Sequence, residues 1–250
     1  MKSYLEAVGE RVVIFDGAVG TNLQRLELSA DDFGGPQFEG CNEMLVDTRA
    51  EVIADLHRSF FDVGCEVVET DSFGSLSFTL GEYGIADRSY ELNLKAAQIA
   101  REVASGYATP GRPRWVAGSI GPGTKFPSLG QIRFAEFRDA FEIQARGLLD
   151  GGVDLLLVET VFDLLQAKAA LIGCRRAMAA VGREVPLQVQ VTIELTGRML
   201  PGTEIGAALV ALDALRPDVI GINCATGPTE MHEHLRHLSQ HCRVPISCLP

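Results

Sequence analysis

Short apolar runs rich in β-branched residues alternate along the chain with longer segments of helical periodicity. The runs lack the strict apolar–polar alternation of a strand with one wet face, so they favour strands that are covered on both faces, as in a parallel sheet. Seven such runs predict strands, at residues 12–15, 66–70, 115–117, 154–158, 187–193, 218–224 and 244–248.

The segments between these runs place apolar residues on one helical face. Phe134, Phe137 and Phe141 begin the clearest example, and residues 52–63 and 231–242 repeat the spacing. Strand–helix alternation repeated this often predicts βαβ units in an α/β fold with a parallel sheet. Seven strands are enough for a doubly wound sheet, but a closed eight-stranded barrel needs one more.

Composition narrows the classes of function. The 250 residues are 46% hydrophobic, and 22 Lys and Arg against 33 Asp and Glu give a net charge of −11. This balance argues against nucleic acid or an anionic membrane as a partner, since both need a basic surface. No apolar run reaches the length of a membrane span, and the first residues lack a secretory pattern. The six scattered cysteines indicate a reduced, cytoplasmic protein in which a special thiol is a metal ligand or a nucleophile.

Polar residues gather where the predicted strands end. Asp16 and Glu159 would enter a pocket there without an obvious cationic side chain to pair with, and a ligand ammonium group would satisfy both. Backbone N–H groups in the turn at residues 17–20 would receive a ligand carboxylate, so the pattern favours a free amino acid. The alternative is that Asp16 makes an Asx turn and Glu159 caps the next helix.

Cys224 follows Asn223 at another strand end and precedes a Gly-Pro turn. A thiol there would be a nucleophile or a metal ligand, but no strand-end histidine supplies an activating base. A buried apolar cysteine is the more ordinary interpretation. Cys248 is a candidate second ligand, although its spacing to Cys224 matches no local zinc motif.

Two other motifs are discounted. His234, His237 and His241 share a helical face opposite the apolar one, so they predict a solvated surface and not a metal site. Residues 118–125 resemble a phosphate loop, but Thr124 precedes Lys125 in the order opposite to that motif.

Four ordered motifs carry a resemblance to a known family. They are Asp-Gly-Ala-Val-Gly-Thr at 16–21, Glu-Thr-Asp-Ser-Phe-Gly at 69–74, Glu-Thr-Val-Phe-Asp at 159–163 with Ala-Lys-Ala-Ala at 167–170, and Gly-Ile-Asn-Cys-Ala-Thr-Gly-Pro at 221–228. From Arg11 to Pro250 the chain resembles the homocysteine S-methyltransferase family. Segments 40–43 and 197–202 make it most similar to the N-terminal homocysteine-binding module of cobalamin-dependent methionine synthases.

The resemblance implies a (β/α)8 TIM barrel, of which residues 1–250 cover about seven strands. It also implies a zinc ion held by three cysteine thiolates, with Cys224 as the first. The homocysteine sulfur would be the fourth ligand, and the enzyme would methylate it to give methionine. The implied substrate-binding residues are Asp16, Gly17, Ala18, Thr70, Ser119, Glu159 and Asn223.

The implied methyl donor is methylcobalamin, carried on another module of a longer chain that also has a folate-binding module. The chain departs from the family pattern in two places. Asp71-Ser72 stands where the family has Asn-Thr, and the Gly-Gly-Cys-Cys-Gly motif that supplies the other two zinc ligands at the eighth strand is absent from these 250 residues. The resemblance therefore implies a domain truncated before its eighth strand. The alternatives are an enzyme with a small donor, such as betaine or S-methylmethionine, and a non-catalytic amino-acid-binding barrel if the chain truly ends at Pro250.

Overall fold

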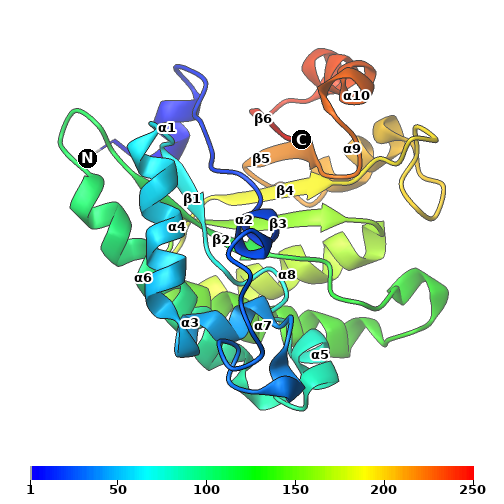
Figure 1. Ribbon diagram of the computed structural model, residues 1–250. Helices are drawn as coiled ribbons and strands as arrows, with labels where there is room; N and C mark the ends of the chain where they lie inside the picture. The colour runs from blue at the N-terminus through cyan, green and yellow to red at the C-terminus, as the bar shows by residue number, and fades with distance from the viewer. Residues whose placement is uncertain (1) are drawn as a thin grey trace.

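Six parallel strands form one sheet in which each strand lies beside the next one in the sequence. The computed structural model describes residues 2–250. Figure 1 shows the sheet curled into an open half-barrel, with helices over its outer face. The strands are β1 (Val67–Glu69), β2 (Trp115–Ile120), β3 (Leu155–Val161), β4 (Leu187–Val191), β5 (Val219–Asn223) and β6 (Ile246–Leu249).

The helices confirm the predicted periodicity. The apolar face that begins at Phe134 belongs to α7, and the patterns at 52–63 and 231–242 belong to α4 and α10. The α-helices are α1 (Tyr4–Val8), α2 (Val19–Gln24), α3 (Leu45–Thr48), α4 (Ala50–Asp62), α5 (Ser77–Leu80), α6 (Ser89–Tyr107), α7 (Phe134–Asp150), α8 (Leu164–Val181), α9 (Ile205–Asp213) and α10 (Pro228–His241). None of the helices in residues 2–250 combines the length and the apolarity that a membrane crossing requires.

The first predicted strand differs from the expectation. Residues 12–15 are extended but form only one bridge, between Phe15 and Val67 of β1, with Asp16 N–H donating to Val67 O at 3.0 Å. Nothing among the described residues pairs with the other side of this segment, so Val12 is 78% exposed and Ile14 52%. Apolar sequence alone predicted a strand, but a regular strand also needs neighbours for its backbone groups.

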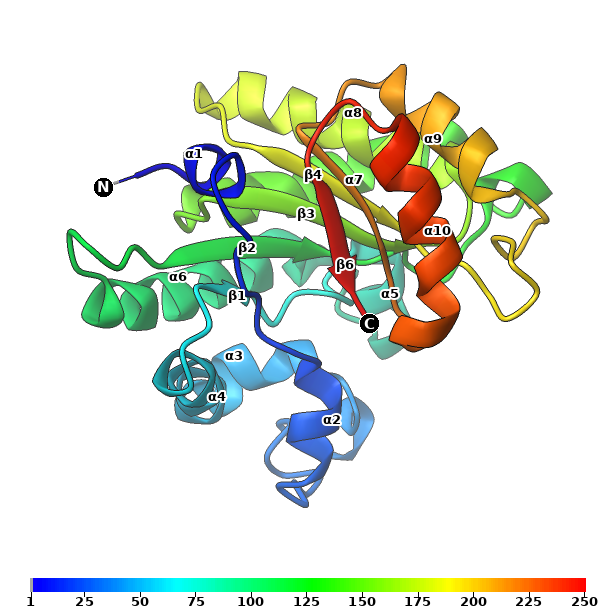
Figure 2. The same cartoon turned by 90° about the horizontal axis from the view of Figure 1, so that it is seen from above.

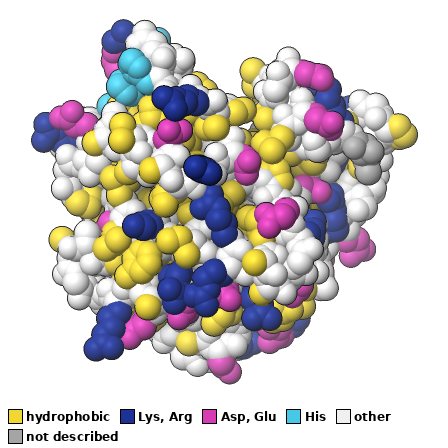
Figure 3. All heavy atoms as spheres, turned by 180° about the vertical axis from the view of Figure 1, so that it is seen from behind, with side chains coloured by type: hydrophobic (Ala, Val, Ile, Leu, Met, Phe, Trp, Pro, Cys, Tyr) yellow, Lys and Arg dark blue, Asp and Glu magenta, His cyan; other side chains and the backbone are white. Residues whose placement is uncertain are grey.

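An open seam separates the segment at residues 12–15 from β6. A cavity of about 610 Å³ lies there, lined by the end of α1, residues 9–13, Phe15, Val219 and residues 245–249. In the view from behind, the molecule is notched between the part that carries the exposed histidines of α10 and the part that carries the N-terminus (Figure 3). The two edges of the curled sheet therefore do not meet.

Side chains alternate between the two faces of the sheet. Val68, Val116 and Leu156 point outward and pack in the core shared with α6, α7 and α8. Val67, Trp115 and Leu157 point inward and pack on Tyr4 of α1, which closes the amino ends of the strands. The Tyr4 hydroxyl donates to Gln188 Oε1 of β4 at 2.7 Å.

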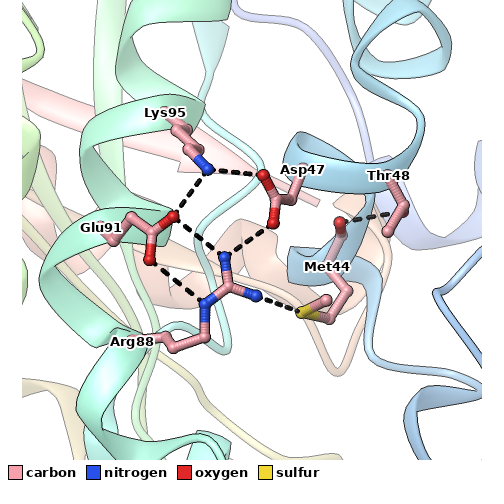
Figure 4. Close-up of polar contacts among 6 residues, drawn as sticks. All are labelled: Met44, Asp47, Thr48, Arg88, Glu91 and Lys95. Carbon is pink, nitrogen blue, oxygen red and sulfur yellow. Dashed lines mark hydrogen bonds and ion pairs between the residues drawn. The ribbon is translucent and has the colours of Figure 1, made fainter.

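A smaller lobe lies against β1 and α6, built from α2, the loop that follows it, α3 and α4 (Figure 2). Four charged side chains join this lobe to α6, and we call them the α3–α6 clamp (Figure 4). They are Asp47 of α3, Arg88 at the start of α6, and Glu91 and Lys95 within α6. Arg88 lies 2.7 Å from Asp47 and 3.0 Å from Glu91, and Lys95 lies 2.6 Å from Glu91. Arg88 also contacts Met44 Sδ at 3.4 Å, which ties the clamp to the short turn that carries Glu43.

Candidate active site

Polar residues continue the inward-facing rows at the carboxyl ends of the strands. Val67 is followed two residues later by Glu69, Ala117 by Ser119, and Leu157 by Glu159. Because inward side chains recur every second residue, these groups enter the same space above the apolar interior. Asn223 ends β5 in the same way.

Glu159 is held by two neighbouring strands. The Ser119 hydroxyl donates to Oε1 at 2.6 Å and Asn223 Nδ2 donates to Oε2 at 3.2 Å. The side chain is 6% exposed, and burial raises its pKa to about 7 against the lowering effect of the Ser119 hydrogen bond. The alternative role as a helix cap is wrong, because Asp163 caps α8 by accepting from Leu165 N–H at 2.8 Å.

Asp16 spans from its loop to β1. Its Oδ2 accepts the Glu69 N–H at 3.0 Å, while its buried Oδ1 has no hydrogen-bond partner within residues 2–250. Burial raises the pKa of Asp16 well above its usual range, and the charge of Glu159 adds to the rise. The bond goes to a neighbouring strand and not into a local turn, so an Asx turn does not describe Asp16.

Glu69 is a third carboxyl in this space and was not among the predicted site residues. Burial raises its pKa strongly, and Glu159 and Asp16 raise it further. Its place in the inward row after Val67 was the available sequence signal, because residues at i and i+2 of a strand share a face. Within the described chain, no Lys or Arg forms an ion pair with any of these three carboxyls.

Cys224 is exposed at the end of β5, so the expectation of a buried apolar cysteine is wrong. Its Sγ lies 3.5 Å from Thr160 Oγ1 and 3.4 Å from Asn223 Nδ2. Cys248 behaves differently, since its Sγ contacts Met231 Sδ of α10 at 3.8 Å.

All eight predicted site residues line one of two adjoining cavities. One of about 350 Å³ is bordered by Asp16, Gly17, Ala18, Glu159, Asn223 and Cys224. The other, of about 250 Å³, shares Ala18, Glu159 and Cys224 and adds Thr70 and Ser119. The Thr70 hydroxyl is already used, by Ser72 Oγ at 2.6 Å and by Ser119 N–H at 3.0 Å, so Thr70 supports the wall of the cavity.

The smaller cavity also contains two carboxyls that approach from distant parts of the sequence. Glu43 Oε1 accepts the Gly74 N–H at 2.7 Å, and Asp71 is 4% exposed with no partner for Oδ2 among the described residues. Burial and the neighbouring Glu43 raise the pKa of Asp71 well above its usual range.

Backbone N–H groups border the larger cavity together with the carboxyls of Asp16, Glu69 and Glu159. Gly17 and Ala18 precede α2, and neither N–H donates to another group in the part of the chain that the structure describes. Free N–H groups at such a turn bind carboxylates. The cavity therefore offers acidic groups to an ammonium and amide groups to a carboxylate, as an amino acid requires.

The site contains one cysteine thiol in a position where it could bind a zinc ion. Cys224 borders both cavities with an exposed thiol, whereas no cluster of three His, Cys, Asp or Glu within residues 2–250 is arranged to hold a metal ion. Zinc takes four ligands in a tetrahedron. A zinc ion beside Cys224 would therefore need further ligands besides this one thiol of the described residues.

Comparison with known proteins gives one family. The profile described as homocysteine S-methyltransferase matches residues 13–250. Two curated relatives named methionine synthase, from Mycobacterium tuberculosis and Mycobacterium leprae, are each 53% identical over 246 residues. The match covers 98% of this chain and 20% of each relative, so the chain spans about a fifth of their length.

Solved structures of low sequence identity share the fold. The homocysteine methyltransferase MmuM from Escherichia coli aligns with a TM-score of 0.75 in its metallated form and 0.76 in its oxidized form. The identity is 20%, and the alignments cover 98% of this chain and 85% of that one. At this identity the likeness shows the fold alone.

Proposed function

The chain belongs to the homocysteine S-methyltransferase family, and we propose that it binds homocysteine for transfer of a methyl group to the thiol, giving methionine. The observation that carries the proposal is the cavity itself, which joins carboxyls without a cation, free backbone N–H groups and one exposed thiol. These are complementary to the ammonium, the carboxylate and the sulfur end of one small amino acid.

In this proposal the protein's own residues orient the substrate. Asp16 and Glu159 receive the ammonium group, and Ser119 and Asn223 hold the Glu159 carboxyl in place by the bonds at 2.6 and 3.2 Å. Gly17 and Ala18 N–H receive the carboxylate, and the thiol then extends toward Cys224. Binding at both ends fixes the direction of the sulfur, which lowers the entropic cost of the reaction.

Cys224 is proposed as a zinc ligand. Zinc bound there would keep the substrate sulfur as a thiolate near neutral pH, which is the nucleophilic form of a thiol. The sulfur forms a bond to the methyl carbon as the bond from that carbon to the donor breaks. The two remaining cysteine ligands are proposed to come from outside residues 2–250.

We propose that a strand entering the seam completes a (β/α)8 TIM barrel, of which residues 1–250 form most of one domain. The unpaired edge at residues 12–15, the partly exposed β6 and the cavity of about 610 Å³ between them support this. The methyl donor is proposed to be methylcobalamin on another module, with a folate-binding module in the same longer chain. The identity to methionine synthases five times as long supports this choice over a small donor.

Cys224→Ala in the full-length protein tests the function. Loss of a zinc ligand should reduce methyl transfer and zinc affinity by at least about 100-fold, since disturbing even the partners of ligands costs 10- to 100-fold. Cys242→Ala, at the end of α10 and outside both cavities, is the matched control and should keep both. Zinc content, circular dichroism and methionine formation are measured on both variants.

Three results would contradict the proposal. Full activity of Cys224→Ala would remove the cysteine from the mechanism. A wild-type protein that binds no zinc and forms no methionine would favour the non-catalytic amino-acid-binding barrel. Methyl transfer from betaine or S-methylmethionine in place of methylcobalamin would leave the homocysteine site standing but overturn the proposed donor.

A further inference from the structure

The backbone beside Cys224 is strained at three residues that are not glycine. Thr160, Cys224 and Ala225 have φ of +56°, +58° and +60°. The left-handed region is unfavourable for a β-branched residue such as threonine, and strain of this kind persists only where surrounding contacts impose it. The register of β3 against β4 also shifts between Val158 and Val161, so Thr160 lies within an irregularity of the strand.

Asn223 imposes this conformation. Its Oδ1 accepts the Thr160 N–H at 2.9 Å, and its Nδ2 donates to Thr160 Oγ1 at 2.9 Å. Thr192 Oγ1 donates to the Asn223 backbone oxygen at 3.1 Å and so fixes the other side of Asn223. The Thr160 side chain, 7% exposed, has one orientation in this arrangement.

That orientation aims the Thr160 hydroxyl at the Cys224 sulfur. Because Thr160 Oγ1 accepts a proton from Asn223, its own proton remains to be donated, and the nearest sulfur is Cys224 Sγ at 3.5 Å. Asn223 Nδ2 contacts the same sulfur at 3.4 Å. A thiolate at Cys224 therefore accepts from the Thr160 hydroxyl, while the two protons of Asn223 Nδ2 are shared among Cys224 Sγ, Thr160 Oγ1 and Glu159 Oε2. The sulfur also borders both cavities.

We propose that Thr160 is a positioning residue that fixes the Cys224 thiolate for metal binding and withdraws charge from its sulfur. Thr160 lines neither cavity and would act through Cys224, so the inference rests on the proposed function. Hydrogen bonds to metal ligands orient the ligand and tune its donor strength. The strained backbone is thus the consequence of directing a threonine hydroxyl from β3 onto a sulfur at the end of β5.

Thr160→Val and Thr160→Ser in the full-length protein test this role. Valine keeps the shape and the β-branch but removes the hydroxyl, and serine keeps the hydroxyl. Zinc affinity, measured by competition with a chromophoric chelator, should fall about tenfold in Thr160→Val and stay within about twofold of wild type in Thr160→Ser. Thr48→Val, which removes a hydroxyl bonded to Met44 O in the lobe, is the control and should bind zinc as wild type does.

A second readout separates this role from general loosening. In the cobalt(II)-loaded protein, a thiolate that loses a hydrogen-bond donor is more electron-rich, so its charge-transfer band should move to longer wavelength in Thr160→Val and remain in Thr160→Ser. If Thr160→Val does not fold, Thr160→Ala, which relieves the β-branch, replaces it with the same expectations. Unchanged zinc affinity and an unchanged band in a folded variant would overturn the proposal. Absence of zinc from the wild-type protein would instead overturn the proposed function.

Discussion

Two groups of carboxyls in this molecule have opposite surroundings. In the α3–α6 clamp, hydrogen bonds from Lys95 and Arg88 lower the pKa of Asp47, and bonds from Arg88 and Lys95 lower that of Glu91. At the carboxyl ends of the strands, burial raises the pKa of Asp16, Glu69 and Glu159. The residue types are the same in both places.

The two groups of carboxyls differ in whether the chain itself supplies a positive charge to balance them. Each carboxylate of the clamp has a lysine or arginine within about 3 Å, so its charge is balanced inside the chain. The cavity carboxyls have no such partner among the described residues, and unpaired buried charge is unfavourable. Functional sites commonly depart from the rule that buried polar groups are satisfied, because a ligand completes them.

The largest expected effect comes from removing a charge that the substrate would balance. Glu159→Gln keeps the size of the side chain but loses the charged hydrogen bond to an ammonium, worth about 1.5–3 kcal/mol. The KM for homocysteine should rise about 10- to 100-fold with a smaller change in kcat, measured by steady-state kinetics. Glu91→Gln in the clamp is the matched control, and its KM should equal that of wild type. Equal KM values for both variants would remove Glu159 from substrate binding.

A smaller effect is expected at Asp71, where removing the carboxyl charge should stabilise the fold. Its pKa is higher in the folded chain than in the unfolded chain, so the folded chain binds more protons and loses stability as pH rises above about 4. Asp71→Asn removes this penalty and should raise the free energy of unfolding at pH 8 by about 1–2 kcal/mol. The gain should shrink as the pH is lowered toward 4, and urea unfolding at several pH values measures it. A variant less stable than wild type at pH 8 would mean that Asp71 has a cationic partner in the protein.

The smallest effect is expected from the same substitution in the clamp. Asp47→Asn breaks the ion pairs with Arg88 and Lys95, which are partly exposed, so the loss of stability should be about 0.5 kcal/mol. Salt at about 1 M should reduce the loss further by screening. A stability gain from Asp47→Asn would show that the two groups of carboxyls do not differ as described.

Much of the fold follows from periodicity in the sequence. Continuous apolar runs gave β1 to β6, and the helical faces gave α4, α7 and α10, because burial on both faces or on one stripe leaves a direct pattern. The polar residues at the strand ends were found for the same reason. Residues 12–15 were not described correctly, since their apolar character is the same as that of a paired strand and only the missing neighbour differs.

The rest of the site depends on contacts that no local pattern encodes. Glu43 meets Gly74 because the residues around it pack in a small separate core, which includes Leu23, Met44 and Leu45. The left-handed conformation of Thr160 is imposed by Asn223, sixty-three residues away in the sequence. Threonine has no propensity for that conformation, so the sequence around Thr160 gave no indication of it.

The bond between Tyr4 and Gln188 bears on the order in which the chain folds. Each strand pairs with its neighbour in sequence, so the sheet is able to extend in the order in which the ribosome delivers it. The Tyr4 hydroxyl, by contrast, meets a partner 184 residues later. This bond can therefore form only after β4 has been synthesised, so the first helix to be made completes its contacts late.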